Sequence, residues 1–273
     1  MQSFRLCVAG SCLIAAFQVP AAPAVLQVFV SIPPQKFFVE RIGGDRVDVS
    51  VMLEPGHVPE TYEPPPKKIA AMQSARLYFL MNVPFERVWS AALPAQGPAF
   101  SIVDTGPPDA RHIADPHAWV ALDDARRIAR VVRDALRATD PPGAEQYSAA
   151  HDELLAELNS LDEEIRILLD RPRTRYFIIS HASLGRFADA YGLEQLALEE
   201  GGREAGPRRL AEIISLARAE GIRTVLIQRQ YHSDSARTLA RELGARVVEI
   251  DPLVEDYFAG VRAVARAVAD ATR

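Results

Sequence analysis

The sequence predicts an α/β protein of two similar lobes, each with a central, mostly parallel sheet flanked by helices, joined by one long rigid helix. Short β-branched apolar runs alternate with amphipathic segments in both halves of the chain, as in βαβ units. Between the halves, residues 144–170 contain neither proline nor glycine. At about 1.5 Å per residue, a helix over this segment would be roughly 40 Å long, the length of a whole lobe.

The first residues have the pattern of a cleaved signal peptide. Arg5 precedes an apolar run over residues 6–17, which is too short to span a bilayer, and Ala22-Pro23-Ala24 offers a small-x-small cleavage site. We therefore expect residues 1–24 to be removed and the mature protein to be periplasmic. Both cysteines leave with this segment, so the mature chain has no disulfide and no thiolate metal ligand.

The N-terminal lobe is expected over residues 25–140. Gly43-Gly44 ends its first helix, and apolar residues recur at helical spacing in its last one. The expected strands cover residues 25–31, 47–53, 77–81 and 100–103, and the expected helices cover residues 35–42, 67–75, 85–93 and 123–139.

The connecting helix is expected within residues 141–172, after the break Asp140-Pro141-Pro142-Gly143. Its apolar residues form one stripe that includes Leu154, Leu158 and Ile165. Such a stripe could form a coiled-coil dimer, but coiled coils usually sustain more heptads. We therefore expect a helix that joins the two lobes within one chain, and a monomer.

The C-terminal lobe, residues 173–273, repeats the pattern of the first. Pro207 begins one of its helices and Gly221 follows it, which is the usual placement of these two residues. The expected strands cover residues 175–180, 195–198, 224–228 and 246–250, and the expected helices cover residues 184–191, 207–220, 233–243 and 257–272.

Composition excludes several classes of protein. Hydrophobic residues make up 48% and charged residues 25% of the chain, which is a globular rather than a disordered composition. The net charge of -5 gives no basic face for nucleic acid. No later apolar stretch approaches the length of a membrane span, so we expect no membrane anchor in the mature chain.

Four loops carry residues that suit a metal site. His57, His117, His181 and Asp251 each stand in a different segment, far apart in sequence. Imidazole and carboxylate ligands suit a borderline divalent ion, and one ligand per segment excludes a zinc finger. This arrangement indicates an ion held between two lobes.

Seven motifs occur in a fixed order along the mature chain: Ser31-Ile32-Pro33-Pro34, Gly43-Gly44-Asp45, Thr61-Tyr62-Glu63-Pro64, Val83-Pro84-Phe85-Glu86, Asp115-Pro116-His117-Ala118-Trp119, Ser180-His181 and Asp251-Pro252-Leu253. Together they resemble the substrate-binding proteins of zinc and manganese ABC importers, in the cluster with a rigid helix between the lobes. The resemblance covers essentially the whole mature chain. It implies a receptor that binds one divalent ion and passes it to an ABC importer permease in the membrane, without any enzymatic turnover.

The resemblance implies three metal ligands directly: His117, His181 and Asp251. The first ligand departs from the family pattern, because Glu60 stands where family members usually carry a histidine and His57 lies three residues earlier. Three alternatives remain at this stage: His57 reaches the metal, Glu60 supplies an oxygen instead, or His57 is a surface histidine.

The ligand set bears on the ion. With His57, three imidazoles and one carboxylate favour Zn²⁺, whereas Glu60 in its place makes a harder site that shifts preference toward Mn²⁺ or Fe²⁺. Zinc is the first expectation and a manganese or iron receptor the alternative. A zinc-dependent hydrolase is a rival class, but no His-Glu-x-x-His or Gly-x-Ser-x-Gly motif occurs. An adhesin or scaffold that needs no metal is a third class.

Several other polar residues are expected to be solvated. The family's long histidine-rich loop is reduced here to residues 105–114, whose one histidine is His112, so a metal-collecting role for this loop has little support. His151, His232 and Glu199 are also expected in solvated positions, although Glu199 could lie beside the metal ligands.

Overall fold

The computed structural model of the protein describes residues 25–89, 100–106, 115–200, 203–231 and 233–273. The predicted signal peptide, the end of the helix predicted at residues 85–93, residues 107–114 with His112, and His232 lie outside the described residues. Within the described part of the chain, none of the helices combines the length and the hydropathy of a membrane span.

The N-terminal lobe is built on a parallel sheet with strand order β2-β1-β3-β4. Gly44, with a positive φ of 57°, turns the chain from α1 toward β2. The elements are β1 (Leu26–Val30), α1 (Pro33–Gly43), the short 3-10 helix η1 (Gly44–Arg46), β2 (Val47–Val51), α2 (Pro66–Met72), β3 (Leu77–Leu80), α3 (Pro84–Trp89) and β4 (Ser101–Asp104).

The C-terminal lobe has a second sheet with strand order β7-β6-β5-β8-β9, parallel except for the pair β6 and β7. Ser233 caps α8 by accepting a hydrogen bond from the backbone of Ala236. The elements are β5 (Tyr176–His181), α6 (Gly185–Ala190), β6 (Glu194–Glu200), β7 (Arg203–Glu204), α7 (Pro207–Glu220), β8 (Thr224–Gln228), α8 (Asp234–Leu243), β9 (Arg246–Ile250) and α9 (Tyr257–Thr272).

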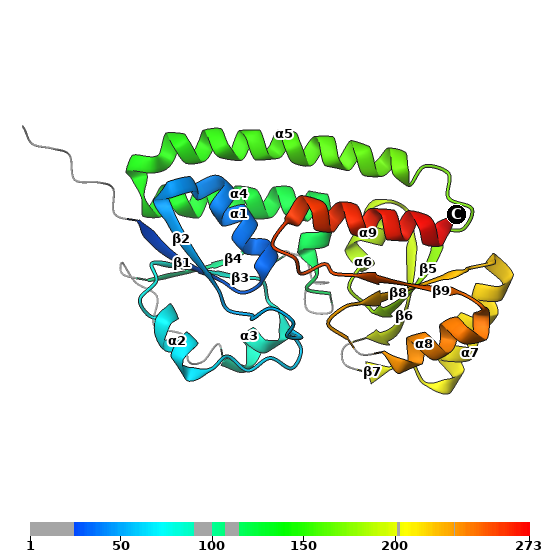
Figure 1. The fold of residues 1–273 in the computed structure, drawn as a ribbon. Coiled ribbons are helices and arrows are strands. Elements are labelled where there is room, and N and C mark those ends of the chain that lie inside the picture. Colours follow the sequence, from blue (N-terminus) through cyan, green and yellow to red (C-terminus); the bar gives the residue numbers. More distant parts are fainter. Residues whose placement is uncertain (1–24, 90–99, 107–114, 201–202, 232) are drawn as a thin grey trace, which may run out of the picture.

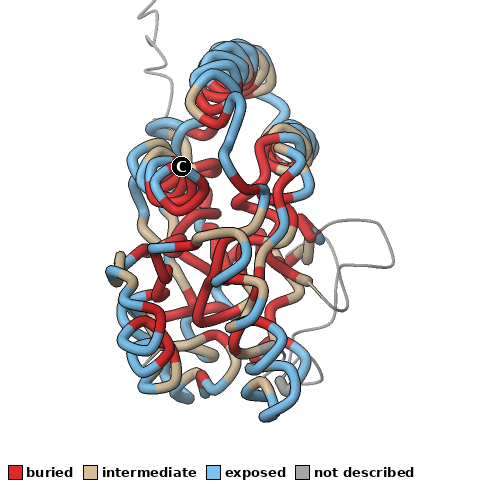
Figure 2. Tube along the Cα trace, turned by 90° about the vertical axis from the view of Figure 1, so that its right-hand side faces the viewer, coloured by how far each residue is buried: buried red, intermediate tan, exposed pale blue. Residues whose placement is uncertain are grey.

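Helices α4 (Leu122–Thr139) and α5 (Ala144–Leu168) join the lobes, with η4 (Ala118–Val120) before α4 and η5 (Pro141–Gly143) between them. Helix α5 has 25 residues and is therefore about 38 Å long. It runs over both lobes and packs on α1, α4 and α9 (Figure 1). The end-on view in Figure 2 shows its buried residues on the side that faces the rest of the molecule. The predicted fold class is confirmed.

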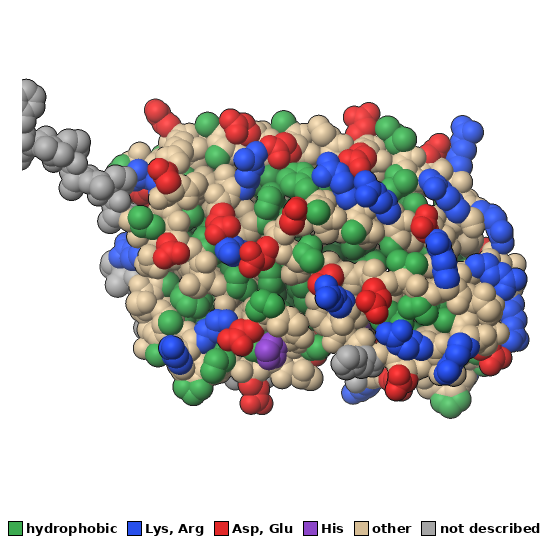
Figure 3. Space-filling model, viewed as in Figure 1, with side chains coloured by type: hydrophobic (Ala, Val, Ile, Leu, Met, Phe, Trp, Pro, Cys, Tyr) green, Lys and Arg blue, Asp and Glu red, His purple; other side chains and the backbone are tan. Residues whose placement is uncertain are grey.

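The hydrophobic core is continuous across the two lobes. One cluster includes residues of both sheets together with the buried stripe of α5, and a second cluster lies between β8, α7 and α8 in the C-terminal lobe. The stripe predicted on α5 is thus buried within the chain. On the face shown in Figure 3, acidic and basic side chains are interspersed over both lobes.

Two expectations about polar residues are wrong. His151 is only 2% exposed, because it lies on the side of α5 that packs against α4, where Arg133 contacts its Nδ1 at 3.3 Å. Glu199 is part of strand β6 rather than of a solvated loop. The short antiparallel strand β7 was not predicted, because two residues carry no periodic signal.

The loops that carry the candidate site residues follow the carboxyl ends of the parallel strands. Glu60 lies in the loop after β2, His117 follows β4, His181 ends β5, Tyr231 follows β8 and Asp251 follows β9. Open parallel sheets bind ligands at this edge. The two lobes direct these edges toward each other.

The packing of α5 gives a first prediction. Leu158→Ala removes a side chain that is 0% exposed in the core, so it is expected to lower the free energy of unfolding by about 2–5 kcal/mol. Ile167→Ala on the same helix is the matched control, because Ile167 is 73% exposed and its truncation is expected to stay within about 0.5 kcal/mol. Denaturant unfolding measures both. Similar losses from the two variants would contradict the packing role of the stripe.

Candidate metal centre

Three side chains from both lobes converge between the sheets. Glu60, His117 and His181 each direct one potential ligand atom into a group whose members lie within 4.8 Å of one another. Glu60 Oε1 lies 3.4 Å from His181 Nε2. Two ligand atoms of a tetrahedral ion with bonds of about 2.0–2.1 Å are separated by about 3.3–3.4 Å, so this pair is spaced as the edge of a zinc site.

Asp115 orients the His117 ring. Its Oδ1 lies 2.8 Å from His117 Nδ1 and also accepts a hydrogen bond of 3.0 Å from the His117 backbone N–H. Burial alone would raise the pKa of Asp115, but the hydrogen bonds and charge of His117, with the charge of Arg186, lower it below its usual value. The ionised carboxylate can only accept, so Nδ1 of His117 donates to it, and Nε2 is the nitrogen that a neutral ring offers to an ion.

Glu199 orients the His181 ring in the same way. The register of the parallel strands β5 and β6 pairs His181 with Glu199, and Glu199 Oε2 lies 2.5 Å from His181 Nδ1. Nδ1 is therefore the protonated nitrogen and Nε2 faces the group of ligand atoms. The His181 side chain is 3% exposed, which excludes most of the water that would compete with an ion.

Tyr231 contacts two members of this group from the C-terminal lobe. Its ring stacks on His181 with centroids 4.1 Å apart and planes 14° apart. Its hydroxyl donates a hydrogen bond to Glu60 Oε2 and lies 3.1 Å from His181 Nε2. Burial, and then the neighbouring charge of Glu60, raises the pKa of Tyr231, so the hydroxyl keeps its proton and acts as the donor.

The other two candidate ligands lie outside this group. His57 is exposed, and its ring packs edge-on against Tyr62 at 5.1 Å between centroids. Asp251 Oδ1 accepts hydrogen bonds from Gln230 Nε2 at 2.6 Å and from the Leu253 backbone N–H at 2.9 Å. Among the described residues, Glu60 rather than His57 thus joins His117 and His181.

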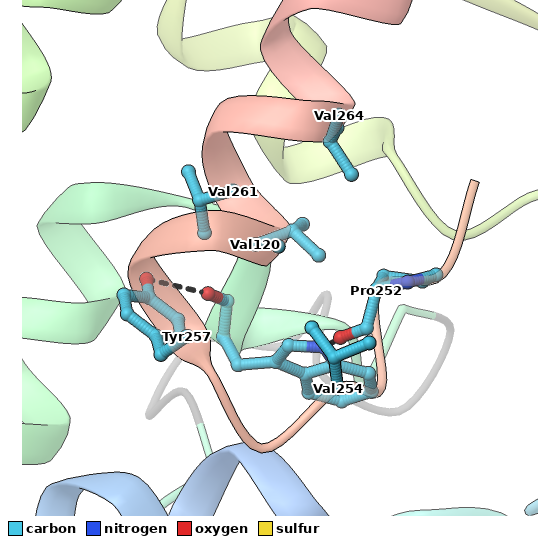
Figure 4. A pocket seen from close by; sticks show the side chains of 8 residues that line it. Val120, Pro252, Val254, Tyr257, Val261 and Val264 are labelled. Atoms are coloured by element: carbon cyan, nitrogen blue, oxygen red, sulfur yellow. Dashed lines mark hydrogen bonds between the residues drawn. The ribbon is translucent and has the colours of Figure 1, made fainter.

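Contacts behind the site tie its loops together. The Trp119 indole donates to the Pro252 carbonyl at 2.8 Å, and the Tyr257 hydroxyl donates to the Trp119 carbonyl at 2.8 Å (Figure 4). These bonds link the His117 loop to the loop after Asp251. The cavity that these side chains line is about 10 Å³, at the lower limit for a single water molecule, so it is a packing gap rather than a ligand site.

The roles of Asp115 and Tyr231 at the site were not predicted from the sequence. Asp115 could have been found, because metal-binding histidines usually donate their second nitrogen to a carboxylate and Asp115 stands two residues before His117. The signal for Tyr231 is its place after strand β8, the same position relative to a strand that the predicted ligands occupy.

The comparisons with known proteins agree with a metal site. A family model described as the periplasmic zinc-uptake complex component A matches residues 28–271. The high-affinity zinc uptake system protein ZnuA of Bacillus subtilis is 25% identical over 251 residues, which cover 84% of this chain and 78% of that protein. The manganese-binding lipoprotein MntA of Halalkalibacterium halodurans is 25% identical over 219 residues, which cover 77% and 73%.

Solved structures of ZnuA have a similar fold. A crystal structure of ZnuA has a TM-score of 0.84 and 33% identity, and the match covers 91% of this chain and 100% of that one. A zinc-bound ZnuA deletion mutant also has a TM-score of 0.84, with 34% identity and coverage of 91% and 98%.

The contact between Glu199 and His181 gives a second prediction. Glu199→Gln is expected to weaken binding of a divalent ion by ten- to a hundredfold, because an amide no longer fixes the tautomer or raises the basicity of the imidazole. Glu194→Gln is the matched control on the same strand, since Glu194 is exposed and pairs with Arg175. Titration of both variants with zinc makes the comparison, and equal affinities would rule out this role for Glu199.

Proposed function

The chain belongs to the family of the periplasmic zinc-uptake complex component A, as its motifs predict, and on this premise we propose that it captures a zinc ion between its lobes and delivers it to an ABC importer. Members of this family are metal-binding receptors rather than enzymes, and the chain is a receptor of this kind. The observation that carries the proposal is the convergence of Glu60, His117 and His181 from two lobes.

The proposed ligands are His117 Nε2, His181 Nε2, one oxygen of Glu60 and one oxygen of Asp251. Glu60 takes the place of the usual histidine, because its carboxylate points at His181 whereas His57 packs on Tyr62 at the surface. The contacts of Asp251 engage Oδ1, so Oδ2 is the oxygen that it would offer. Asp251 joins the site when the ion draws its loop toward the other three ligands.

Zinc is the proposed cargo. Two imidazole nitrogens and two carboxylate oxygens suit zinc, and the 3.4 Å spacing of Glu60 Oε1 and His181 Nε2 fits its tetrahedral bonds. Affinity also rises from manganese to zinc for any such donor set. Manganese is the second candidate, because the carboxylate of Glu60 makes the site harder than one with three imidazoles and because MntA, which is named as manganese-binding, is among the relatives.

The proposed place of action is the periplasm. Residues 1–24 would direct export and be removed, and the mature chain would consist of an N-terminal lobe over residues 25–140, a connecting helix within residues 141–172 and a C-terminal lobe over residues 173–273. The loaded monomer would then dock on the permease of the importer. Element analysis of protein purified without chelator, with competitive titration by zinc, manganese and iron, tests the proposal, and protein that binds none of them would refute it.

The first ligand gives a third prediction. Glu60→Ala is expected to lower zinc affinity by at least tenfold, because it removes a ligand, whereas His57→Ala is expected to leave the affinity within about twofold. Competitive titration against a zinc chelator of known affinity measures both variants. A larger loss in His57→Ala would show that the loop rearranges and that His57 is the ligand.

Binding should also stabilise the fold. Zinc at a hundredfold excess over its dissociation constant is expected to add about 2.7 kcal/mol to the free energy of unfolding, because the ion binds only the folded chain. Thermal unfolding with zinc and with EDTA at the same pH measures the shift. His181→Ala serves as the control and should show little or none of it. Identical curves for the unaltered protein would argue against a metal receptor.

A further inference from the structure

The hydroxyl of Tyr231 forms a hydrogen bond that joins the two lobes. Tyr231 follows β8 in the C-terminal lobe, and its hydroxyl donates to Oε2 of Glu60, which follows β2 in the N-terminal lobe. The bond therefore joins one proposed ligand to a residue outside the proposed ligand set.

The position of Tyr231 is fixed from several sides. Its ring stacks on the buried ring of His181. Its backbone N–H donates to the Gln228 carbonyl at 3.0 Å, and its neighbour Gln230 is bound to Asp251 at 2.6 Å. The hydroxyl is thus held at the site by the stack and by the loop, and not only by its bond to Glu60.

The two oxygens of Glu60 have different neighbours as a result. Oε2 accepts the hydrogen bond from Tyr231, while Oε1 lies 3.4 Å from His181 Nε2 at the spacing of two ligands on a tetrahedral ion. A phenol has a single hydrogen, and here it goes to Oε2. His181 binds Glu199 through Nδ1, so Nε2, which also lies 3.1 Å from the Tyr231 hydroxyl, is the nitrogen that faces the proposed ion site.

We infer that Tyr231 determines the ion selectivity of the site by occupying one oxygen of Glu60, so that this carboxylate binds the ion through Oε1 alone. The inference rests on the proposed function and on Glu60 as a ligand. A carboxylate that binds through one oxygen keeps the site four-coordinate, the arrangement that zinc adopts with nitrogen and oxygen ligands. A carboxylate that binds through both oxygens adds a ligand and approaches the oxygen-rich, higher coordination typical of manganese.

Tyr231→Phe tests this inference, because it removes the hydroxyl and keeps the ring that stacks on His181. The ratio of zinc affinity to manganese affinity is expected to fall at least tenfold, mainly through tighter manganese binding as Oε2 becomes available. Tyr62→Phe is the matched control: Tyr62 lies in the Glu60 loop, but its hydroxyl donates to the Met52 carbonyl and not to a ligand. The ratio of zinc affinity to manganese affinity in Tyr62→Phe is expected to stay within twofold of that in the unaltered protein.

Cobalt(II) substitution gives a readout that a merely structural role of Tyr231 would not move. The unaltered protein is expected to show the intense visible absorption of four-coordinate cobalt, and Tyr231→Phe the weaker absorption of a higher coordination number. If Tyr231→Phe does not fold, Tyr231→Leu is expected to show the same fall in the ratio.

The outcomes separate this inference from the proposed function. Unaltered protein that binds neither zinc nor manganese would overturn both. Normal zinc binding that is insensitive to Glu60→Gln would remove the ligand on which Tyr231 acts, and with it the inference, while the receptor function would stand. An unchanged ratio with an unchanged cobalt spectrum in Tyr231→Phe, or a five- or six-coordinate spectrum in the unaltered protein, would overturn the inference alone.

Discussion

The burial of one apolar stripe on α5 is the constraint on which the rest of the structure depends. The stripe must be shielded from water, and it is shielded by helices of both lobes, α1 and α4 on one side and α9 on the other. Because helices of both lobes pack on the same helix, which is about 38 Å long, the two lobes cannot change their separation freely. Their carboxyl edges are thereby held opposite each other, and loops that are far apart in sequence meet between them. The distance between ligands from different lobes therefore depends on how both lobes pack on α5.

The register of the strands also determines which carboxylate contacts which histidine of the site. The pairing of β5 with β6 places Glu199 beside His181, and a shift of one residue would turn that carboxylate to the other face of the sheet. Asp115 reaches His117 by a local turn instead, two residues apart in the chain. Both routes have the same result: a carboxylate takes the hydrogen of Nδ1 and leaves Nε2 for an ion. The tautomers of the proposed ligands therefore follow from secondary structure before any ion is present.

Much of the fold could be predicted from sequence, and the reasons are local. Helix α7 has the predicted bounds because Pro207 and Gly221 mark both ends, and β8 and β9 match because their apolar runs are short and well bounded. The site was harder to predict. Glu60 and His57 are three residues apart in one turn-rich loop, and only the packing of this loop on the rest of the lobe decides which of them lies beside His117 and His181. The burial of His151 likewise depends on how α4 and α5 pack, which helical periodicity does not specify.

The replacement of the usual histidine by Glu60 changes what can distinguish one ion from another. On the proposed ligand set, two carboxylates cancel the charge of any divalent ion, so charge does not separate zinc from manganese. The number of donor atoms still separates them, and a carboxylate is the ligand whose donor number can be one or two. A group that occupies one of its oxygens therefore acts on selectivity without touching the ion. In this chain that group comes from the opposite lobe, since Tyr231 follows β8 and Glu60 follows β2. The hydrogen bond between them joins the two lobes, whose separation is limited by the packing of their helices on α5.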